Sequence, residues 1–211
     1  NSCGSNSIAY GSTRDHLVST RGFLADGSEV SFGPLTPGEF AAKCEAADSL
    51  ETRIYRGLRD LLGNEAARQT IRESFPNPQV TRRNTGYALD ALLDASCFEP
   101  QSEMPFNLCR LLAGSEGTLF FGVEYELGLI PLPPPGTLLC VHCQSVDEAL
   151  RATVIVMQSR PRLADPNGSE LTGCELIDDK ILSCTKDNLE QARNRSFVVG
   201  EPGAVLVVEL K

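Results

Sequence analysis

The sequence predicts an α+β fold in two parts, and three features of the chain support this prediction. A β-hairpin signal near the start is followed by three helical segments that look like cover for a sheet. The stretch Pro131–Gly136 is then predicted to be a linker, because its prolines are stiff and lack the amide donors that a sheet requires. Beyond it, strands and helices follow in the order of a split β-α-β layer. We therefore expect one domain over residues 1–136 and a second over residues 137–211.

Three segments of the first part favour β-strands. Residues 15–24 and 29–32 favour strands, and Asp26-Gly27 between them is a short-loop signal that suits a type I′ hairpin turn. Later, Thr118–Ile130 is so β-rich and so little interrupted by polar residues that we expect a mostly buried strand.

The three helices of the first part have start signals that satisfy free backbone amides. Thr36-Pro37-Gly38-Glu39 combines a capping box with a proline in the first turn, while Ser49 and Asn64 are capping residues. The expected helix ends are near Ala47, at Gly63 and before Pro76-Asn77-Pro78. A short helix over residues 88–93 and a helical turn that contains Leu108, Leu111 and Leu112 should follow.

The second part is expected to begin with a strand over residues 138–143. Ser145-Val146-Asp147-Glu148 is a capping box, so a helix to about Ser159 should follow. The remaining expected elements are a strand over residues 174–177, a helix over 178–185 and a terminal strand over 204–210.

Composition excludes several classes of partner. The formal net charge of −9 disfavours nucleic acids and anionic membranes, since both are polyanions. No apolar run approaches the roughly 20 residues that span a bilayer. The eight cysteines are interpreted as reduced thiols of a cytoplasmic protein, because a chain of this size has enough aliphatic residues to fold without disulfides.

The stretch Gly114-Ser115-Glu116-Gly117 is the strongest candidate for a functional site. It forms a tight connection between a helical apolar run and a β-rich run, and its bare backbone amides could lie against a ligand. Glycine-rich turns of this kind also occur as plain connections, so the residues alone leave both interpretations open.

The stretch 114–119 resembles the Gly-Ser-Glu-Gly-Thr-Leu signature of the flavin-linked oxidases, the family of D-lactate, glycolate and D-2-hydroxyglutarate dehydrogenases with the FAD-binding fold of vanillyl-alcohol oxidase. Three further matches occur in the order that this family requires. They are Asn1-Ser2-Cys3-Gly4 with Tyr10-Gly11, Asn84-Thr85-Gly86-Tyr87, and Pro131-Leu132-Pro133-Pro134. The resemblance therefore covers essentially the whole chain.

The resemblance implies both a fold and a cofactor. Residues 1–136 would be the second subdomain of a PCMH-type FAD-binding domain, without the phosphate-binding subdomain, and residues 137–211 the start of a ferredoxin-like substrate or cap domain. FAD would be the cofactor of the parent protein, and we expect it to be absent from the isolated chain. The cofactor contacts implied by the resemblance are Asn1, Ser2, Cys3, Gly4, Tyr10, Gly11, Gly114, Ser115, Glu116, Gly117, Thr118 and Gly122.

The implied activity is the oxidation of a 2-hydroxy acid by hydride transfer to the flavin, with electrons passed to a separate acceptor. The length of the helical segment between Leu35 and Pro78 resembles the larger family members, which have an iron-sulfur domain further on. The partners left open are an iron-sulfur protein or a peripheral membrane site. The catalytic base and the substrate-binding groups of the family would lie beyond Lys211, so no catalytic residue is assigned.

One departure from the family pattern favours a rival function. Where the family continues Gly-Ile-Ile-Thr-Glu, this chain has Phe120-Phe121-Gly122-Val123-Glu124. Two phenylalanines at this point would reshape the surface that meets the adenine end of the cofactor. The alternative is a non-catalytic interaction module that keeps the fold without the cofactor.

A metal site and a nucleophilic site are both disfavoured. Cys140-Val141-His142-Cys143 resembles half of a zinc knuckle, but Cys140 and His142 would face one side of a strand and Cys143 the other. His16 and His142 are the two histidines of the chain, and no nucleophile elbow or papain-like cysteine motif accompanies them.

Overall fold

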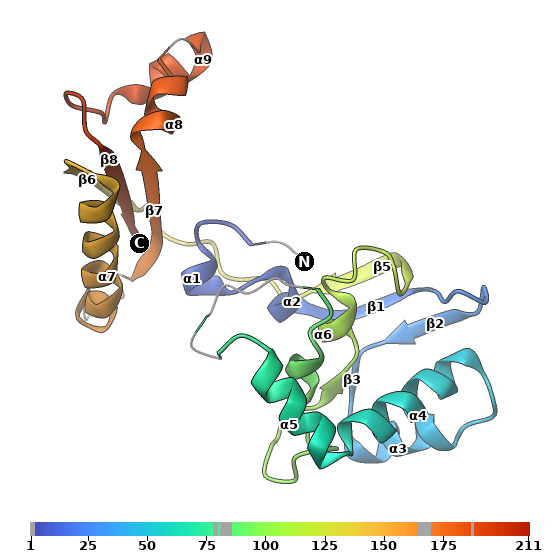
Figure 1. The fold of residues 1–211 in the computed structure, drawn as a ribbon. Coiled ribbons are helices and arrows are strands. Elements are labelled where there is room, and N and C mark those ends of the chain that lie inside the picture. Colours follow the sequence, from blue (N-terminus) through green and yellow to red (C-terminus); the bar gives the residue numbers. More distant parts are fainter. Residues whose placement is uncertain (1–2, 78–79, 81–85, 164–169, 187) are drawn as a thin grey trace. The chain divides into compact units, whose positions relative to one another are not determined.

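The computed structural model describes residues 3–77, 80, 86–163, 170–186 and 188–211, of which 160–163 are described by their backbone (Figure 1). Asn1, Ser2 and the pairs Arg82-Arg83 and Asn84-Thr85 therefore lie outside the described residues. The chain divides into two compact units. The first unit comprises Asn1–Cys3 and Gly11–Leu129, and the second comprises Gly4–Tyr10 and Ile130–Lys211.

The first unit is built on an antiparallel sheet. Strand β1 (Leu17–Phe23) lies at its centre, between β2 (Glu29–Phe32) and β5 (Phe121–Leu127). A second, two-stranded sheet joins β3 (Pro34–Leu35) to β4 (Phe106–Asn107). Together with the helices of the unit, these antiparallel sheets confirm the predicted α+β class.

The predicted helix starts of the first unit are correct. The Thr36 side chain accepts from the Glu39 amide, Ser49 from the Thr52 amide, and Asn64 from the Ala67 amide. These three bonds satisfy amides that have no partner inside their own helix. The helical elements of this unit are α2 (Thr13–His16), α3 (Pro37–Glu45), α4 (Leu50–Leu62), α5 (Glu65–Ser74), the 3₁₀ helix η1 (Leu89–Leu92) and α6 (Cys109–Leu112).

An aromatic cluster forms the centre of the first core. The rings of Phe40 and Phe106 lie 4.6 Å apart between centroids, and Tyr55 packs edge-on against Phe40 at 5.9 Å. Phe106 and Tyr55 are almost completely buried. Burial raises the pKa of the Tyr55 hydroxyl well above its ordinary value, so this residue stays neutral in the core.

The hairpin between β1 and β2 was predicted correctly, but its turn type was not. A type I′ turn needs positive φ at both central residues. Here the Gly27 amide donates to the Leu24 carbonyl, and Gly27 has a φ of 80° while Asp26 does not have positive φ. The loop is therefore a longer turn that ends in a left-handed glycine, and Asp26 instead accepts from the Ser28 amide and hydroxyl.

The expectation of a buried strand over Thr118–Ile130 is wrong. Strand β5 is shorter, and its apolar side chains alternate along one exposed face, with Phe121 70% exposed and Tyr125 58% exposed. Strand β5 lies at the edge of its sheet, where β1 is its one partner among the described strands, and the apolar side chains of that face are largely exposed. Glu124 on the opposite face pairs with Arg21 of β1, so that face is polar.

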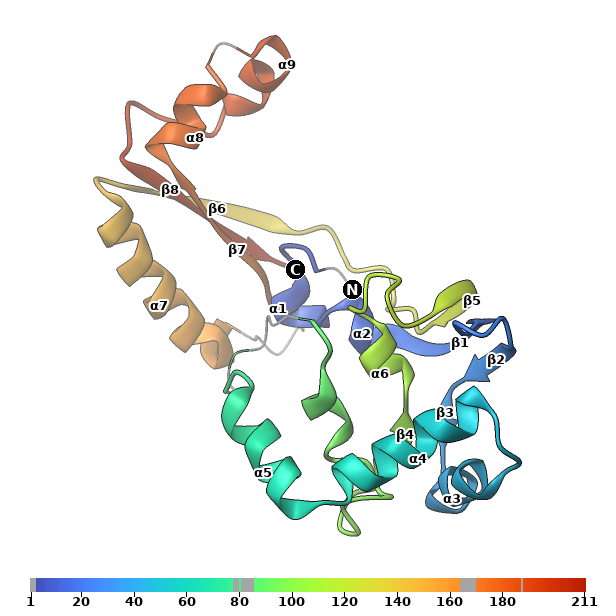
Figure 2. The ribbon, with the colours of Figure 1, turned by 45° about the vertical axis from the view of Figure 1, so that its right-hand side comes forward.

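The second unit has the split β-α-β order. Its sheet runs β6-β8-β7, so that β6 (Thr137–Cys143) and β7 (Leu171–Asp178) flank β8 (Ala204–Leu210) and both run antiparallel to it. Helix α7 (Val146–Leu163) connects β6 to β7 and lies along one face of the sheet (Figure 2). The other helical elements of this unit are α1 (Ser7–Tyr10), α8 (Asp179–Cys184), α9 (Leu189–Ala192) and η2 (Arg193–Arg195).

Two local expectations differ from the structure in this unit. Helix α7 continues past Ser159 to Leu163, and β7 starts three residues before Cys174. Pro131–Gly136 has no regular secondary structure, as predicted for a linker. Within the described residues, no helix is both long and apolar enough to cross a bilayer.

Candidate functional site

The Gly114–Leu119 segment is a double turn with an unusual backbone. After α6, the Ser115 amide donates to the Leu112 carbonyl at 3.0 Å, and Gly114 has a φ of 107°. The Thr118 amide then donates to the Ser115 carbonyl at 3.0 Å, with positive φ at both Glu116 (52°) and Gly117 (76°). Positive φ at both central positions is the pattern of a type I′ turn. Glu116 is the one non-glycine residue with positive φ in the described part of the chain.

This double turn is fixed at both ends by side chains from other elements. Arg14 of α2 is 7% exposed and donates from Nε and Nη2 to the Ala113 carbonyl at 3.2 and 2.9 Å. At the other end, the Thr118 hydroxyl donates to the Ser115 carbonyl at 2.5 Å and lies 2.7 Å from the Tyr87 hydroxyl. Because charged donors form stronger hydrogen bonds than neutral ones, Arg14 is the main anchor.

A cavity of about 350 Å³ lies beside the turn. One wall is formed by the end of α6 and the turn, from Leu112 to Gly117. The other wall is formed mainly by side chains of β1 and β5 and by Phe120; the residues there are Thr13, Leu17, Thr20, Phe120, Tyr125 and Leu127. A hollow with apolar side chains on one wall and a glycine-containing turn on the other suits a flat organic ligand with a few polar atoms.

Gly122 is required by a close contact next to this cavity. A Cβ atom on Gly122 would lie only 2.0 Å from the Tyr125 hydroxyl, so no larger residue fits without moving that side chain. The two neighbouring phenylalanines differ in burial. Phe120 is buried, with its ring 5.5 Å from that of Phe32, whereas Phe121 points away from the core. Of the two phenylalanines that depart from the family pattern, only Phe120 therefore lines the cavity.

The N-terminal segment is divided between the two units. Cys3 and Gly11 belong to the first unit, but Gly4 and Tyr10 belong to the second, where α1 contacts β7. Gly11 has a φ of 76°, and a Cβ there would meet the Asp15 carboxylate at 2.6 Å. Of the predicted contacts, Gly114, Ser115, Glu116 and Gly117 line the cavity, Thr118 closes the turn and Gly122 lies in β5. Gly4 and Tyr10 belong to the other unit.

Sequence reasoning missed the residue that holds the N-terminal segment in place. Asn6 lies between two charged side chains of the second unit, with its amide nitrogen 3.0 Å from Glu209 Oε2 and its oxygen 2.8 Å from Lys211 Nζ. Ile8 packs against the buried side chains of the same unit. No local signal marks these residues, because their partners lie about two hundred positions further along the chain.

The Cys140–Cys143 segment has no metal geometry in the described residues. It forms the end of β6, where Cys143 is buried and His142 Nε2 accepts a hydrogen bond from the Val199 amide at 3.1 Å. No group of three or more potential ligands among the described His, Cys, Asp and Glu residues could hold a metal ion. The eight cysteines are all free thiols.

The sequence of this chain was compared with those of known proteins, and several of them are similar to it. No family model matches the chain. The protein named "D-2-hydroxyglutarate dehydrogenase" of Escherichia coli (strain K12) is 30% identical over 186 residues, which are 88% of this chain and 16% of that protein. Those of Pantoea ananatis and Pseudomonas putida are 27% and 30% identical, over 94% and 85% of this chain and 17% and 16% of their own lengths.

These comparisons confirm the resemblance that the sequence motifs predict. The chain is similar over most of its own length to proteins that are enzymes by name, dehydrogenases of a 2-hydroxy acid. It spans about one sixth of the length of these relatives.

Proposed function

We propose that this chain, which is similar over most of its length to proteins named D-2-hydroxyglutarate dehydrogenase, is one part of an FAD-dependent dehydrogenase of that 2-hydroxy-acid class. The observation that carries the proposal is the Gly114–Thr118 double turn. Gly114 and Gly117 have positive φ, and the turn forms one wall of a cavity. A second proposal, that residues 137–211 begin the substrate domain, is supported by the split β-α-β order.

The residues of the cavity fit a nucleotide cofactor such as FAD. Gly114, Ser115 and Gly117 offer a stretch of wall with small side chains beside Glu116, and Phe120 and Leu127 offer an apolar surface for a flat ring. Gly122 leaves room for the Tyr125 side chain, because a Cβ atom at position 122 would lie 2.0 Å from the Tyr125 hydroxyl. When bound, the flavin would supply the ability to accept a hydride from the carbinol carbon of a 2-hydroxy acid.

The role of this chain in that chemistry is binding and orientation. Arg14 holds the Ala113 carbonyl and so fixes the direction in which the following turn leaves α6. The Tyr87 and Thr118 hydroxyls fix the other end of the turn. A rigid turn loses little conformational entropy when a ligand binds, and preorganised contacts therefore favour affinity. The free thiols are in keeping with a reducing compartment, and we propose the cytoplasm.

A titration of the 211-residue protein with FAD, followed by the NMR signals of backbone amides, tests this proposal. We expect shifts that concentrate on the Gly114–Thr118 amides, with a weak affinity of the order of 1 mM, because the chain spans only about one sixth of the length of its relatives and is proposed to supply part of the cofactor site. Absence of shifts in these amides up to about ten times that concentration would contradict the assignment. Protein that retains stoichiometric FAD through purification would contradict the expected division of the binding site.

Two alanine variants separate a specific effect from a loss of stability. Gly117 and Gly27 have nearly the same φ, 76° and 80°, and a Cβ at either position meets no atom within 4 Å. Each Gly→Ala change should therefore destabilise the first unit by a similar amount, about 1 kcal/mol. Only Gly117→Ala should abolish the FAD-dependent shifts. In the full-length protein that contains this chain, the same variant should slow flavin reduction by D-2-hydroxyglutarate, whereas Gly27→Ala should not.

A further inference from the structure

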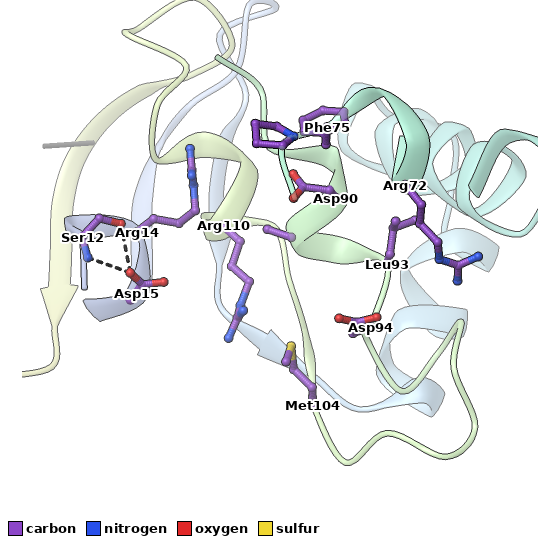
Figure 3. A pocket seen from close by; sticks show the side chains of 12 residues that line it. Ser12, Arg14, Asp15, Arg72, Phe75, Asp90, Leu93, Asp94, Met104 and Arg110 are labelled. Carbon is purple, nitrogen blue, oxygen red and sulfur yellow. Dashed lines mark hydrogen bonds between the residues drawn. The ribbon is translucent and has the colours of Figure 1, made fainter. Parts of the chain in front are cut away.

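The first unit contains a second cavity, and it is larger than the one beside the turn. Its volume is about 510 Å³, and it is bordered by α2, α5, η1 and α6 (Figure 3). None of its lining residues also lines the cavity at the Gly114–Thr118 turn. The proposed function therefore assigns no role to it.

Four of the six charged side chains around this cavity interact with another group of the chain. Asp90 is one of them, although its Oδ1 is buried without a hydrogen-bond partner in the described residues. Arg14 donates to the Ala113 carbonyl, and Asp15 accepts from the Ser12 amide at 2.7 Å. Arg72 pairs with Glu65 at 3.1 Å. These three groups are satisfied without a ligand and give no reason to expect one.

Two side chains of opposite charge differ from this pattern. Arg110 extends from α6, and Asp94 extends from the segment that follows η1, on different sides of the cavity (Figure 3). Within the described part of the chain, neither makes a hydrogen bond or an ion pair, and they are not within 4.0 Å of each other. Arg110 is half-buried, so its charge is only partly compensated by water, whereas Asp94 is exposed at the rim of the cavity.

Part of the remaining wall is apolar, and this surface together with the two charges determines which class of ligand fits. Leu93 is buried and borders the cavity together with Phe75 and Met104. A simple carboxylate would satisfy Arg110 but would face the Asp94 carboxylate, and a simple amine would satisfy Asp94 but would face the Arg110 guanidinium. A molecule with both groups and a short carbon chain satisfies both charges and covers the apolar wall.

We propose that this cavity binds a small organic zwitterion, a molecule of the amino-acid class, with its carboxylate on Arg110 and its ammonium group on Asp94. The carbon chain of the ligand packs against Leu93 and Met104. The proposal does not depend on FAD binding, because the two cavities share no lining residue.

Calorimetric titration of the 211-residue protein tests this proposal with four probes. L-leucine has its two charges on one carbon, and 5-aminopentanoate has them at opposite ends of a chain. Pentanoate and pentylamine retain one charge each. We expect one of the two zwitterions to bind with a dissociation constant of about 1 mM, and each single-charge probe to bind at least about tenfold more weakly. Equal binding of pentanoate or pentylamine, or no binding of either zwitterion at about 20 mM, would overturn the proposal.

Two variants test whether Arg110 and Asp94 bind the ligand, and a third serves as a control. Arg110→Gln and Asp94→Asn should each weaken binding of the zwitterion about tenfold, since each removes one charge contact. Arg72→Gln is the matched control, because Arg72 borders the same cavity but already pairs with Glu65, and its change should be less than about twofold. Circular dichroism verifies that each variant is folded. Folded Arg110→Gln or Asp94→Asn protein that binds like the wild type would overturn the assignment.

Discussion

Replacing Arg14 by methionine should destabilise the first unit strongly. Methionine keeps most of the apolar length of the side chain but removes both hydrogen bonds to the Ala113 carbonyl, at 3.2 and 2.9 Å. Ala113 is only 8% exposed, so water cannot readily replace the lost donors. Leaving a buried carbonyl without a charged donor costs about 2 to 3 kcal/mol. With a typical dependence of stability on urea, this corresponds to a fall of about 1 to 2 M in the midpoint of unfolding.

Urea unfolding followed by tyrosine fluorescence measures this effect. The chain has four tyrosines and no tryptophan, and Tyr55, Tyr87 and Tyr125 all lie in the first unit. The matched control is Arg21→Met in the neighbouring strand. Arg21 also bridges two partners, Glu29 at 2.7 Å and Glu124 at 2.8 Å, but its side chain is half exposed.

The comparison of the two arginines decides whether burial is the cause. Exposed ion pairs contribute little because water and salt screen them. Arg21→Met should therefore shift the midpoint much less than Arg14→Met, and most of its effect should vanish at high salt. Equal midpoints for wild type and Arg14→Met, or a larger loss for Arg21→Met, would refute the reasoning. Amide exchange in Gly114–Thr118 should also become faster in Arg14→Met, since the turn loses its anchor.

Two further predictions concern the linker and the thiols. Limited proteolysis should cut Pro131–Gly136, which is exposed and lacks regular structure, before it cuts α4, whose inner face is buried; first cuts within α4 would contradict the position of the boundary. For the thiols, burial raises the pKa of Cys109 to about 11, so at pH 8 it is almost entirely protonated and should react with a thiol reagent only after unfolding, or as pH rises toward that value. The exposed Cys184 should react at once, and rapid labelling of Cys109 in folded protein at pH 8 would show that its burial is wrong.

Features set by neighbouring residues could be predicted from the sequence. The caps at Thr36, Ser49 and Asn64 are correct because each involves a side chain and an amide three residues later, which the sequence places side by side. The split β-α-β order of the second unit is also correct. There, the alternation of strands and helices leaves few ways to connect the elements.

Features set by distant residues could not be predicted. The apolar residues of β5 alternate with glutamates, as in a half-buried strand, and the burial of the apolar face depends on whether another element covers it. The bond from Arg14 to the Ala113 carbonyl joins residues 99 positions apart, and nothing near Arg14 marks it as a buried side chain. The hairpin turn failed for a local reason, because Asp26-Gly27 also fits a longer loop in which only Gly27 has positive φ.

The conformation of Glu116 connects the shape of the turn with its proposed role. A side chain at positive φ costs about 1 kcal/mol relative to glycine, and the chain uses glycine at the two neighbouring positive-φ positions, 114 and 117. Glutamate at 116 is therefore not the residue that the backbone alone would favour. The strained conformation persists because Arg14 and Thr118 hold the segment at both ends. Glu116 also lines the cavity beside the turn, and this position supports our proposal that the turn contacts a ligand.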